Sequence, residues 1–126
     1  MGIRFLKIAV VYLVIGVVMG IVMGITRQFQ FAPAHAHVNL LGWATFAISG
    51  VVYVLFPQAA ATRLAAWHFW LLNVGVPIFV VGLALFAAGN EAVLPLTIAG
   101  SFITLAALIV FLVNVFVNVR EPRAAL

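Results

Sequence analysis

The stretch Ile8–Ile25, IAVVYLVIGVVMGIVMGI, contains no charged residue and one polar side chain, that of Tyr12. A helix needs roughly 20 predominantly apolar residues to cross the hydrocarbon core of a bilayer. This stretch and its flanks therefore predict a transmembrane helix over about 5–25. Three further apolar runs predict transmembrane helices over about 34–56, 65–88 and 93–119.

The composition of the whole chain agrees with a membrane protein. Of its 126 residues, 67% are hydrophobic and 6% charged, and the mean hydropathy is +1.34. So few polar side chains could not cover the surface of a soluble domain. We therefore expect an all-α integral membrane protein, a single four-transmembrane-helix bundle over 1–126 in contact with the lipid bilayer, with no room for a soluble catalytic domain.

The charged residues carry information about orientation. Six Lys and Arg stand against two acidic residues, but they flank apolar spans, so they act as topology signals and do not imply nucleic-acid binding. With four spans, only Arg27 falls on one side. The other side receives Arg4, Lys7, Arg63, Arg120 and Arg123. Because cytoplasmic loops are enriched in Lys and Arg, both termini are predicted to be cytoplasmic.

The absence of cysteine limits the possible cofactors. With no Cys in the sequence, the chain can form no disulfide, iron–sulfur cluster, thiolate zinc site or covalent c-type haem. Any haem would therefore be held non-covalently, as a b-type haem.

The candidate binding residues gather in Pro33–Trp43, PAHAHVNLLGW, at the start of the second span. Residues two apart on an α-helix are about 200° apart, so His35 and His37 should point to opposite faces and not chelate one metal. The stripe that begins at His35 should face the bundle, and the stripe that begins at His37 should face lipid or a second protomer. Asn39 could orient a ligand imidazole, and Gly42 leaves a flat gap beside it.

Glycines recur at regular spacings in the first and third spans. Gly16, Gly20 and Gly24 share one face of the first helix, which indicates close helix packing or a groove for a flat cofactor. Met19 and Met23 lie beside them and are candidate thioether ligands. In the third span, a packing seam is expected from Gly75, Gly82 and Gly89, and Pro77 should free the carbonyl group of Asn73.

The third histidine, His68, lies in Trp67–Trp70, WHFW, at the inner start of the third span. Such an aromatic cluster is typical of the headgroup level, so we expect an interfacial histidine, with an inner-side metal ligand or a quinone-contacting residue as the alternatives. The predicted topology places His68 about 30 Å from His35 and His37, across the hydrocarbon core.

The fourth span carries a stripe of small and polar residues that should face the bundle interior, because amides facing lipid would be unsatisfied. Asn114 and Asn118 could then hydrogen-bond to a neighbouring helix. The stripe consists of Gly100, Thr104, Ala107, Phe111, Asn114 and Asn118.

The segment Ala34–Trp43, AHAHVNLLGW, resembles the second transmembrane helix of the catalytic subunit of haem-copper oxidases, including the nitric oxide reductase branch. The resemblance implies that a histidine here is an axial ligand of a haem. His37-Val38-Asn39 is similar to the reductase pattern and Ala34-His35-Ala36 to the oxygen-reductase pattern, so both histidines remain candidates. With Trp67–Gly75, WHFWLLNVG, most of the chain resembles short bacterial membrane proteins described as cytochrome c oxidase subunit I-like.

The leading hypothesis is a homo-oligomeric b-type haem protein of the bacterial inner membrane, a dimer in the favoured form, for electron transfer or for binding nitric oxide or oxygen. We do not expect an enzyme acting alone, because the later helices that carry the superfamily's other metal ligands are absent. A cofactor-free accessory subunit of a respiratory oxidase and a copper protein using a histidine with Met19 or Met23 are the alternatives.

Overall fold

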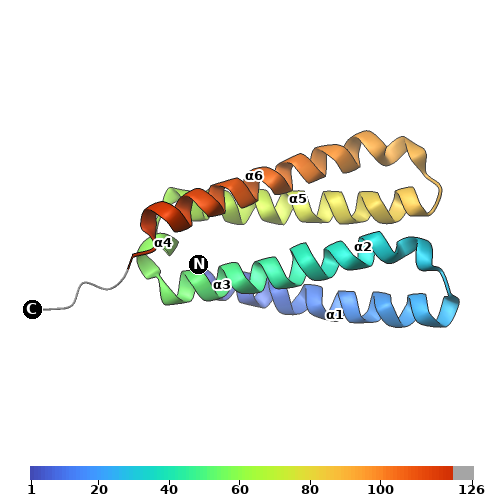
Figure 1. Ribbon diagram of the computed structural model, residues 1–126, viewed down its shortest axis with the longest axis horizontal. Coiled ribbons are helices and arrows are strands. Elements are labelled where there is room, and N and C mark those ends of the chain that lie inside the picture. Colours follow the sequence, from blue (N-terminus) through green and yellow to red (C-terminus); the bar gives the residue numbers. More distant parts are fainter. Residues whose placement is uncertain (121–126) are drawn as a thin grey trace, which may run out of the picture.

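The computed structural model describes residues 1–120 and is helical apart from short turns, with no strand in this part of the chain. The long helical stretches follow one another in the order of the chain, each running in the direction opposite to the one before it (Figure 1). Their bounds are α1 Gly2–Thr26, α2 Ala32–His37, α3 Thr45–Leu55, α4 Pro57–Ala60, α5 Arg63–Ala87 and α6 Leu94–Asn118. Single 3₁₀ turns at Phe29–Phe31 and Glu91–Val93 precede α2 and α6.

Four of these helical stretches are long and apolar enough to cross a membrane, as predicted. The four stretches are Gly2–Thr26, Phe29–Leu55, Arg63–Ala87 and Glu91–Asn118. The 3₁₀ turns extend the second and fourth spans at their starts, and Thr62 fixes the start of α5 because its hydroxyl group accepts a hydrogen bond from Ala65 N at 3.1 Å. Four such helices are consistent with a multi-pass membrane protein.

The second span contains a π-helical segment, Val38–Ala44, between α2 and α3. Leu40 O accepts two hydrogen bonds here, one from the backbone N–H group of Thr45, five residues later, and one from the Thr45 hydroxyl group at 2.8 Å. A π-turn rotates the residues after it relative to those before it. The residues on the two sides of this segment therefore do not form one continuous α-helical stripe, which the sequence did not indicate.

The bundle consists of two helical hairpins (Figure 1). In one, α1 packs against α3 and the π-helical segment, and in the other, α5 packs along α6. Small residues allow the second hairpin to close: a Cβ atom at Gly75 would lie 2.7 Å from Thr104 N, and one at Gly100 would lie 2.6 Å from Phe79 N. Gly82 packs against Thr97 in the same way.

The expected seam along the third span is correct for Gly75 and Gly82 but wrong for Gly89. Gly89 lies in the turn after α5, where its φ of +96° favours glycine, and a Cβ atom there would meet nothing within 4 Å. By contrast, the predicted interior stripe of α6 is confirmed. Gly100, Thr104, Ala107 and Asn114 are buried, and Phe111 and Asn118 are half-buried.

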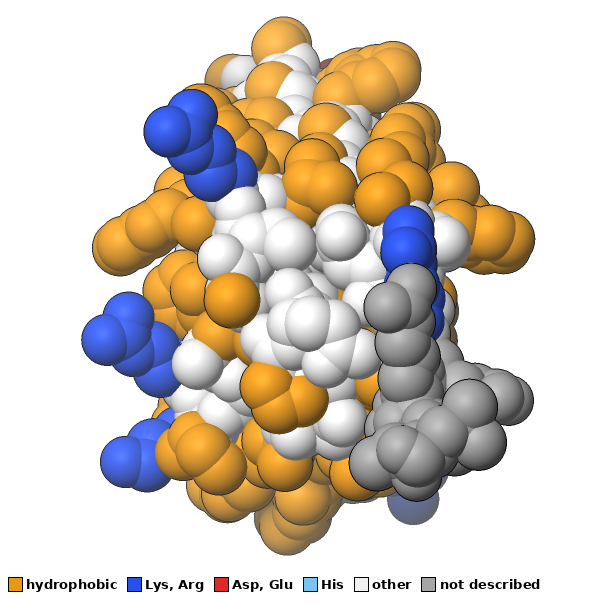
Figure 2. All heavy atoms as spheres, turned by 90° about the vertical axis from the view of Figure 1, so that its left-hand side faces the viewer, with side chains coloured by type: hydrophobic (Ala, Val, Ile, Leu, Met, Phe, Trp, Pro, Cys, Tyr) orange, Lys and Arg blue, Asp and Glu red, His pale blue; other side chains and the backbone are white. Residues whose placement is uncertain are grey.

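The cationic residues collect at the end of the bundle that carries the N-terminus and α4. Figure 2 shows Lys and Arg side chains around the rim of this end. Arg4 and Lys7 lie at the start of α1, Arg63 begins α5, and Arg120 follows α6, whereas Arg27 caps α1 at the opposite end. Arg123, which also entered the predicted orientation, lies outside the described residues.

Candidate functional site

His35 and Asn39 pack into the glycine groove of α1. A Cβ atom at Gly20 would lie 3.1 Å from His35 Cε1, and one at Gly16 would lie 2.5 Å from Asn39 Oδ1. Gly24 meets nothing within 4 Å. Gly16 and Gly20 therefore accommodate side chains of the second span, which is the helix-packing interpretation, and this groove has no space left for a flat cofactor.

Asn39 determines which nitrogen of His35 carries the proton. Its Nδ2 atom donates to His35 O at 2.9 Å and lies 3.5 Å from His35 Nδ1. An amide nitrogen only donates, so this contact favours the neutral tautomer of His35 in which Nδ1 accepts and Nε2 carries the proton. Asn39 thus orients an imidazole, as expected, but in the tautomer that leaves no lone pair on Nε2.

His37 has the opposite tautomer. Its Nδ1 atom lies 2.7 Å from Pro33 O, one helical turn earlier. A carbonyl oxygen only accepts, so Nδ1 carries the proton and Nε2 has a free lone pair. This is the arrangement of most metal-binding histidines, in which a hydrogen bond from one nitrogen fixes the ring while the other nitrogen binds the metal.

The ring of His37 is half-buried and packs against α5. It contacts Phe79 edge-on, with ring centroids 4.9 Å apart and planes at 75°. The expectation of a lipid-facing or partner-facing stripe is wrong at this position, although Ile48 and Leu55 farther along it are exposed as expected. The π-helical segment between them is the physical reason, because it changes the phase of the helix.

The structure does not bring the histidines together on one metal. His35 contacts α1 and His37 contacts α5, and no cluster of three or more His, Asp or Glu suited to a metal occurs within residues 1–120. The flat gap expected beside Gly42 is also absent, because the ring of Tyr12 packs directly against Gly42. The prediction of an open slot at Gly42 is therefore wrong.

His68 is fully buried, with 0% of its surface exposed, so the prediction of an interfacial histidine is wrong. Its ring is stacked between Phe5 of α1 and Phe111 of α6, at centroid distances of 5.0 and 4.7 Å. The flanking Trp67 and Trp70 are exposed and occupy the surface positions expected for the aromatic cluster. The helix period separates them: His68 lies on the buried face with Ala65 and Leu72.

A chain of hydrogen bonds connects His68 to α6. Tyr53 Oη lies 3.0 Å from His68 Nδ1 and accepts from Asn114 Nδ2 at 3.2 Å. Asn114 Nδ2 also donates to Ala59 O at 3.1 Å, and Asn114 Oδ1 accepts from Asn118 Nδ2 at 2.8 Å. The predicted hydrogen bond from Asn114 to a neighbouring helix is thus confirmed, and it serves a buried polar cluster that was not predicted.

The cluster contains a buried atom without a hydrogen-bonding partner, His68 Nε2. Because Tyr53 accepts from Asn114, its own proton is available for His68 Nδ1, which places the proton of the neutral imidazole on Nε2. This donor faces the apolar interior. A buried donor without a partner costs about 1–3 kcal/mol, so the cluster orders the helix ends at some cost in stability.

His68 lies closer to the level of His37 along the bundle than predicted. The interval from His68 to Phe79, the residue that His37 contacts, spans about 16 Å along α5, whereas the sequence predicted about 30 Å. The separation of His68 and His37 along the bundle axis is therefore shorter than one hydrocarbon thickness. It remains far too long for one metal ion to be shared.

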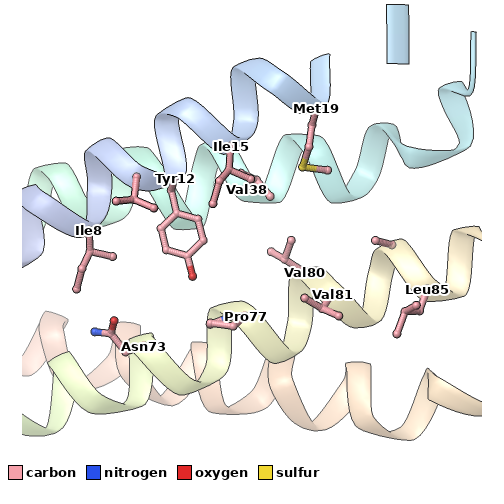
Figure 3. Close-up of a pocket in the computed structure, with 12 residues that line it drawn as sticks. Ile8, Tyr12, Ile15, Met19, Val38, Asn73, Pro77, Val80, Val81 and Leu85 are labelled. Atoms are coloured by element: carbon pink, nitrogen blue, oxygen red, sulfur yellow. The ribbon is translucent and has the colours of Figure 1, made fainter. Parts of the chain in front are cut away.

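Met19 and Met23 line the same hollow near the end of α1. Met23 is buried, and both sulfur-bearing side chains line a hollow of about 210 Å³ with Thr26, Gln28 and Phe31. Met19 also lines a larger groove between α1 and α5, with a volume of about 520 Å³ (Figure 3). We call it the α1/α5 groove, and neither His35 nor His37 lines it.

Comparisons with protein-family models, with curated proteins and with solved structures give no match for this chain.

Proposed function

We propose that the protein binds a b-type haem through His37 and serves electron transfer or the binding of nitric oxide or oxygen. The observation that carries the proposal is the hydrogen bond from His37 Nδ1 to Pro33 O. It leaves Nε2 unprotonated and holds the ring in place, which are the two requirements of an axial ligand. The resemblance of Ala34–Trp43 to a haem-binding helix points to the same stretch.

His35 fits the role less well than His37. The hydrogen bonds of Asn39 favour a proton on His35 Nε2, and the ring packs against the backbone of α1 at Gly20. To bind iron, His35 would have to change its tautomer and leave this contact. This reverses the preference that the helical stripe alone suggested.

The donor set of one chain is incomplete for a six-coordinate haem. His37 supplies one nitrogen, and the ring of His35 packs against α1 while that of His37 packs against α5, so the two do not converge on one iron. A two-fold symmetric homodimer would supply the partner's copy of His37. With no cysteine for covalent attachment, the group would be held by coordination and apolar contact, and it would supply a one-electron redox centre or a site for a diatomic gas.

The proposed location is the cytoplasmic membrane of a bacterium, with the N-terminus and α4 on the cytoplasmic side. The support is the distribution of cations, with Arg4, Lys7, Arg63 and Arg120 at one end of the bundle and Arg27 at the other. This distribution follows the enrichment of Lys and Arg in cytoplasmic loops. The His37 site would then be nearer the outer face.

A copper site is the second candidate, because Met19 and Met23 share one hollow near the outer end of α1. Thioether ligands favour Cu(I). An accessory subunit would need a surface for its partner, and the glycine face of α1 offers little, since side chains of the same chain cover Gly16 and Gly20 and leave Gly24 open.

The test is a haem titration of the full chain, purified in mild detergent and monitored by Soret absorbance and metal analysis. We expect a saturable Soret band that is lost in His37→Ala and retained in His35→Ala, with His68→Phe as a control that leaves the outer site intact. No Soret band in the wild type would exclude the function. Loss of the band in His35→Ala alone would exclude the assignment of the ligand, and copper without haem would favour the second candidate.

A further inference from the structure

The α1/α5 groove is mainly apolar and has a few polar groups on its walls. Of the 12 residues that line it, only Tyr12 and Asn73 have oxygen- or nitrogen-bearing side chains, and none is charged. Figure 3 shows the hydroxyl group of Tyr12 directed from α1 toward α5, where Asn73 and Pro77 form the opposite wall. A mainly apolar cavity with a few convergent polar groups is typical of a small-molecule site.

The position of Tyr12 is set by its neighbours. Its ring packs against Gly42 of the π-helical segment and lies 5.6 Å from the ring of Phe46, with an interplanar angle of 34°. A side chain larger than hydrogen at position 42 would displace this ring. The ring is therefore wedged against the second span while its hydroxyl group faces the groove as a hydrogen-bond donor.

The opposite wall provides acceptors. Asn73 Nδ2 donates to Phe69 O at 2.7 Å, which leaves Asn73 Oδ1 for another partner. Pro77 has no N–H group and lies within α5, so the backbone carbonyl group of Asn73 lacks its usual helical donor. The groove thus has the hydroxyl donor of Tyr12 on one wall and the amide oxygen of Asn73 on the other.

The depth of these groups restricts the ligand. Tyr12 lies about 8 Å along α1 beyond Lys7, the last charged residue before the apolar stretch, and therefore within the hydrocarbon core. The headgroup of a phospholipid does not reach this depth. A ligand here must be apolar and uncharged, and it must carry oxygen atoms able to accept from Tyr12 or donate to Asn73.

We infer that the α1/α5 groove binds the ring of a lipid-soluble isoprenoid quinone. The carbonyl groups of the oxidised ring match the Tyr12 hydroxyl, and the hydroxyl groups of the reduced ring match the oxygen acceptors of Asn73. The apolar walls formed by Ile8, Val80 and Leu85 suit the ring faces and the isoprenoid tail. The inference is independent of haem binding, because the groove is not lined by His35 or His37.

The test uses the full chain in phosphatidylcholine nanodiscs without haem. The probe is a photoreactive azido derivative of decylubiquinone, and labelled peptides are mapped by mass spectrometry. We expect labelling on α1 and α5 that is competed by decylubiquinone and hardly competed by decylbenzene, which has the same tail and no oxygen atoms. Equal competition by decylbenzene, or labelling elsewhere on the protein, would overturn the inference.

Variants give a second, quantitative test. Tyr12→Phe should weaken competition by decylubiquinone about tenfold, because it removes one hydrogen bond without changing the ring. Ala84→Phe fills the groove and should abolish specific labelling, whereas Ala106→Phe places the same ring on the exposed face of α6 and should leave labelling unchanged. Circular dichroism and size-exclusion chromatography check that each variant is folded. Unchanged labelling in folded Ala84→Phe would contradict the inference.

Discussion

The histidines at the two ends of the bundle have opposite environments. At the end with the N-terminus and α4, four helices surround His68: α1 supplies Phe5, α3 Tyr53, α5 the histidine itself and α6 Phe111. At the other end, His35 and His37 are each half-buried and lean on one neighbouring helix. We call these the closed end and the histidine-pair end.

The difference separates the structural role of His68 from the ligand-binding role that we propose for His37. His68 is enclosed on both ring faces and tied to a network that crosses the bundle, so an iron or substrate could reach it only after the helices separate. His37 keeps a free Nε2 atom in a fixed ring at a partly exposed position. Removing side chains at the closed end should therefore affect stability, and removing them at the histidine-pair end should affect binding.

The largest expected effect on stability is that of Phe5→Ala. Phe5 is fully buried and contacts the rings of Phe46, Tyr53, His68 and Phe69. Removing this ring should lower the free energy of unfolding by about 3–5 kcal/mol. Unfolding by sodium dodecyl sulfate in mixed micelles measures the change. A loss below about 1 kcal/mol would show that the closed end does not hold the helices together.

Asn114→Ala should be next, with a loss of about 2 kcal/mol. The amide bridges α6 to Tyr53 and to Ala59 O, so its removal leaves buried polar groups without partners. Asn118→Ala is the matched control, since Asn118 is half-buried and bonds only within α6 among the described residues. The same detergent titration compares the two variants, and equal losses would mean that the cross-helix bonds contribute nothing.

The glycine groove can be tested by a matched pair in α1. Gly16→Ala forces a methyl group against Asn39 Oδ1 and should cost about 1–2 kcal/mol. Gly24→Ala adds the same methyl group where nothing lies within 4 Å, so it should be neutral or slightly stabilising. Detergent unfolding of the two variants side by side should separate them by at least about 1 kcal/mol. Equal unfolding free energies of the two variants would contradict the close approach of α1 to the second span.

His68→Phe should have a small effect, within about 1 kcal/mol of the wild type. The substitution loses the hydrogen bond to Tyr53, but it keeps an aromatic ring between Phe5 and Phe111 and removes the unpaired Nε2 donor. His68→Ala leaves a cavity and should cost clearly more in the same titration. If both variants lose stability equally, then the imidazole nitrogen atoms matter more than the ring.

Much of this fold could be predicted because a transmembrane helix is determined by the length and apolarity of its own segment of sequence. Length and apolarity determine the four helices, and the α6 stripe from Gly100 to Asn118 follows from the helix period. His68 could have been placed inside by the same reasoning, since it shares a face with Ala65 and Leu72, but the neighbouring Trp67 and Trp70 suggested an interface. The surroundings of the candidate site could not be predicted in the same way. Neither the π-helical segment nor the packing of Tyr12 on Gly42 has a signal within its own span, because both depend on the contact between α1 and the second span.

The most direct test of the central claim, that His37 Nε2 binds haem iron, is chemical rescue. His37→Gly should lose the Soret band and regain it when millimolar imidazole is added to the haem-supplemented protein, because free imidazole can occupy the position of the missing ring. His35→Gly should keep the band without imidazole. A Soret spectrum in His37→Gly identical to that of the wild type, with no response to imidazole, would contradict the account.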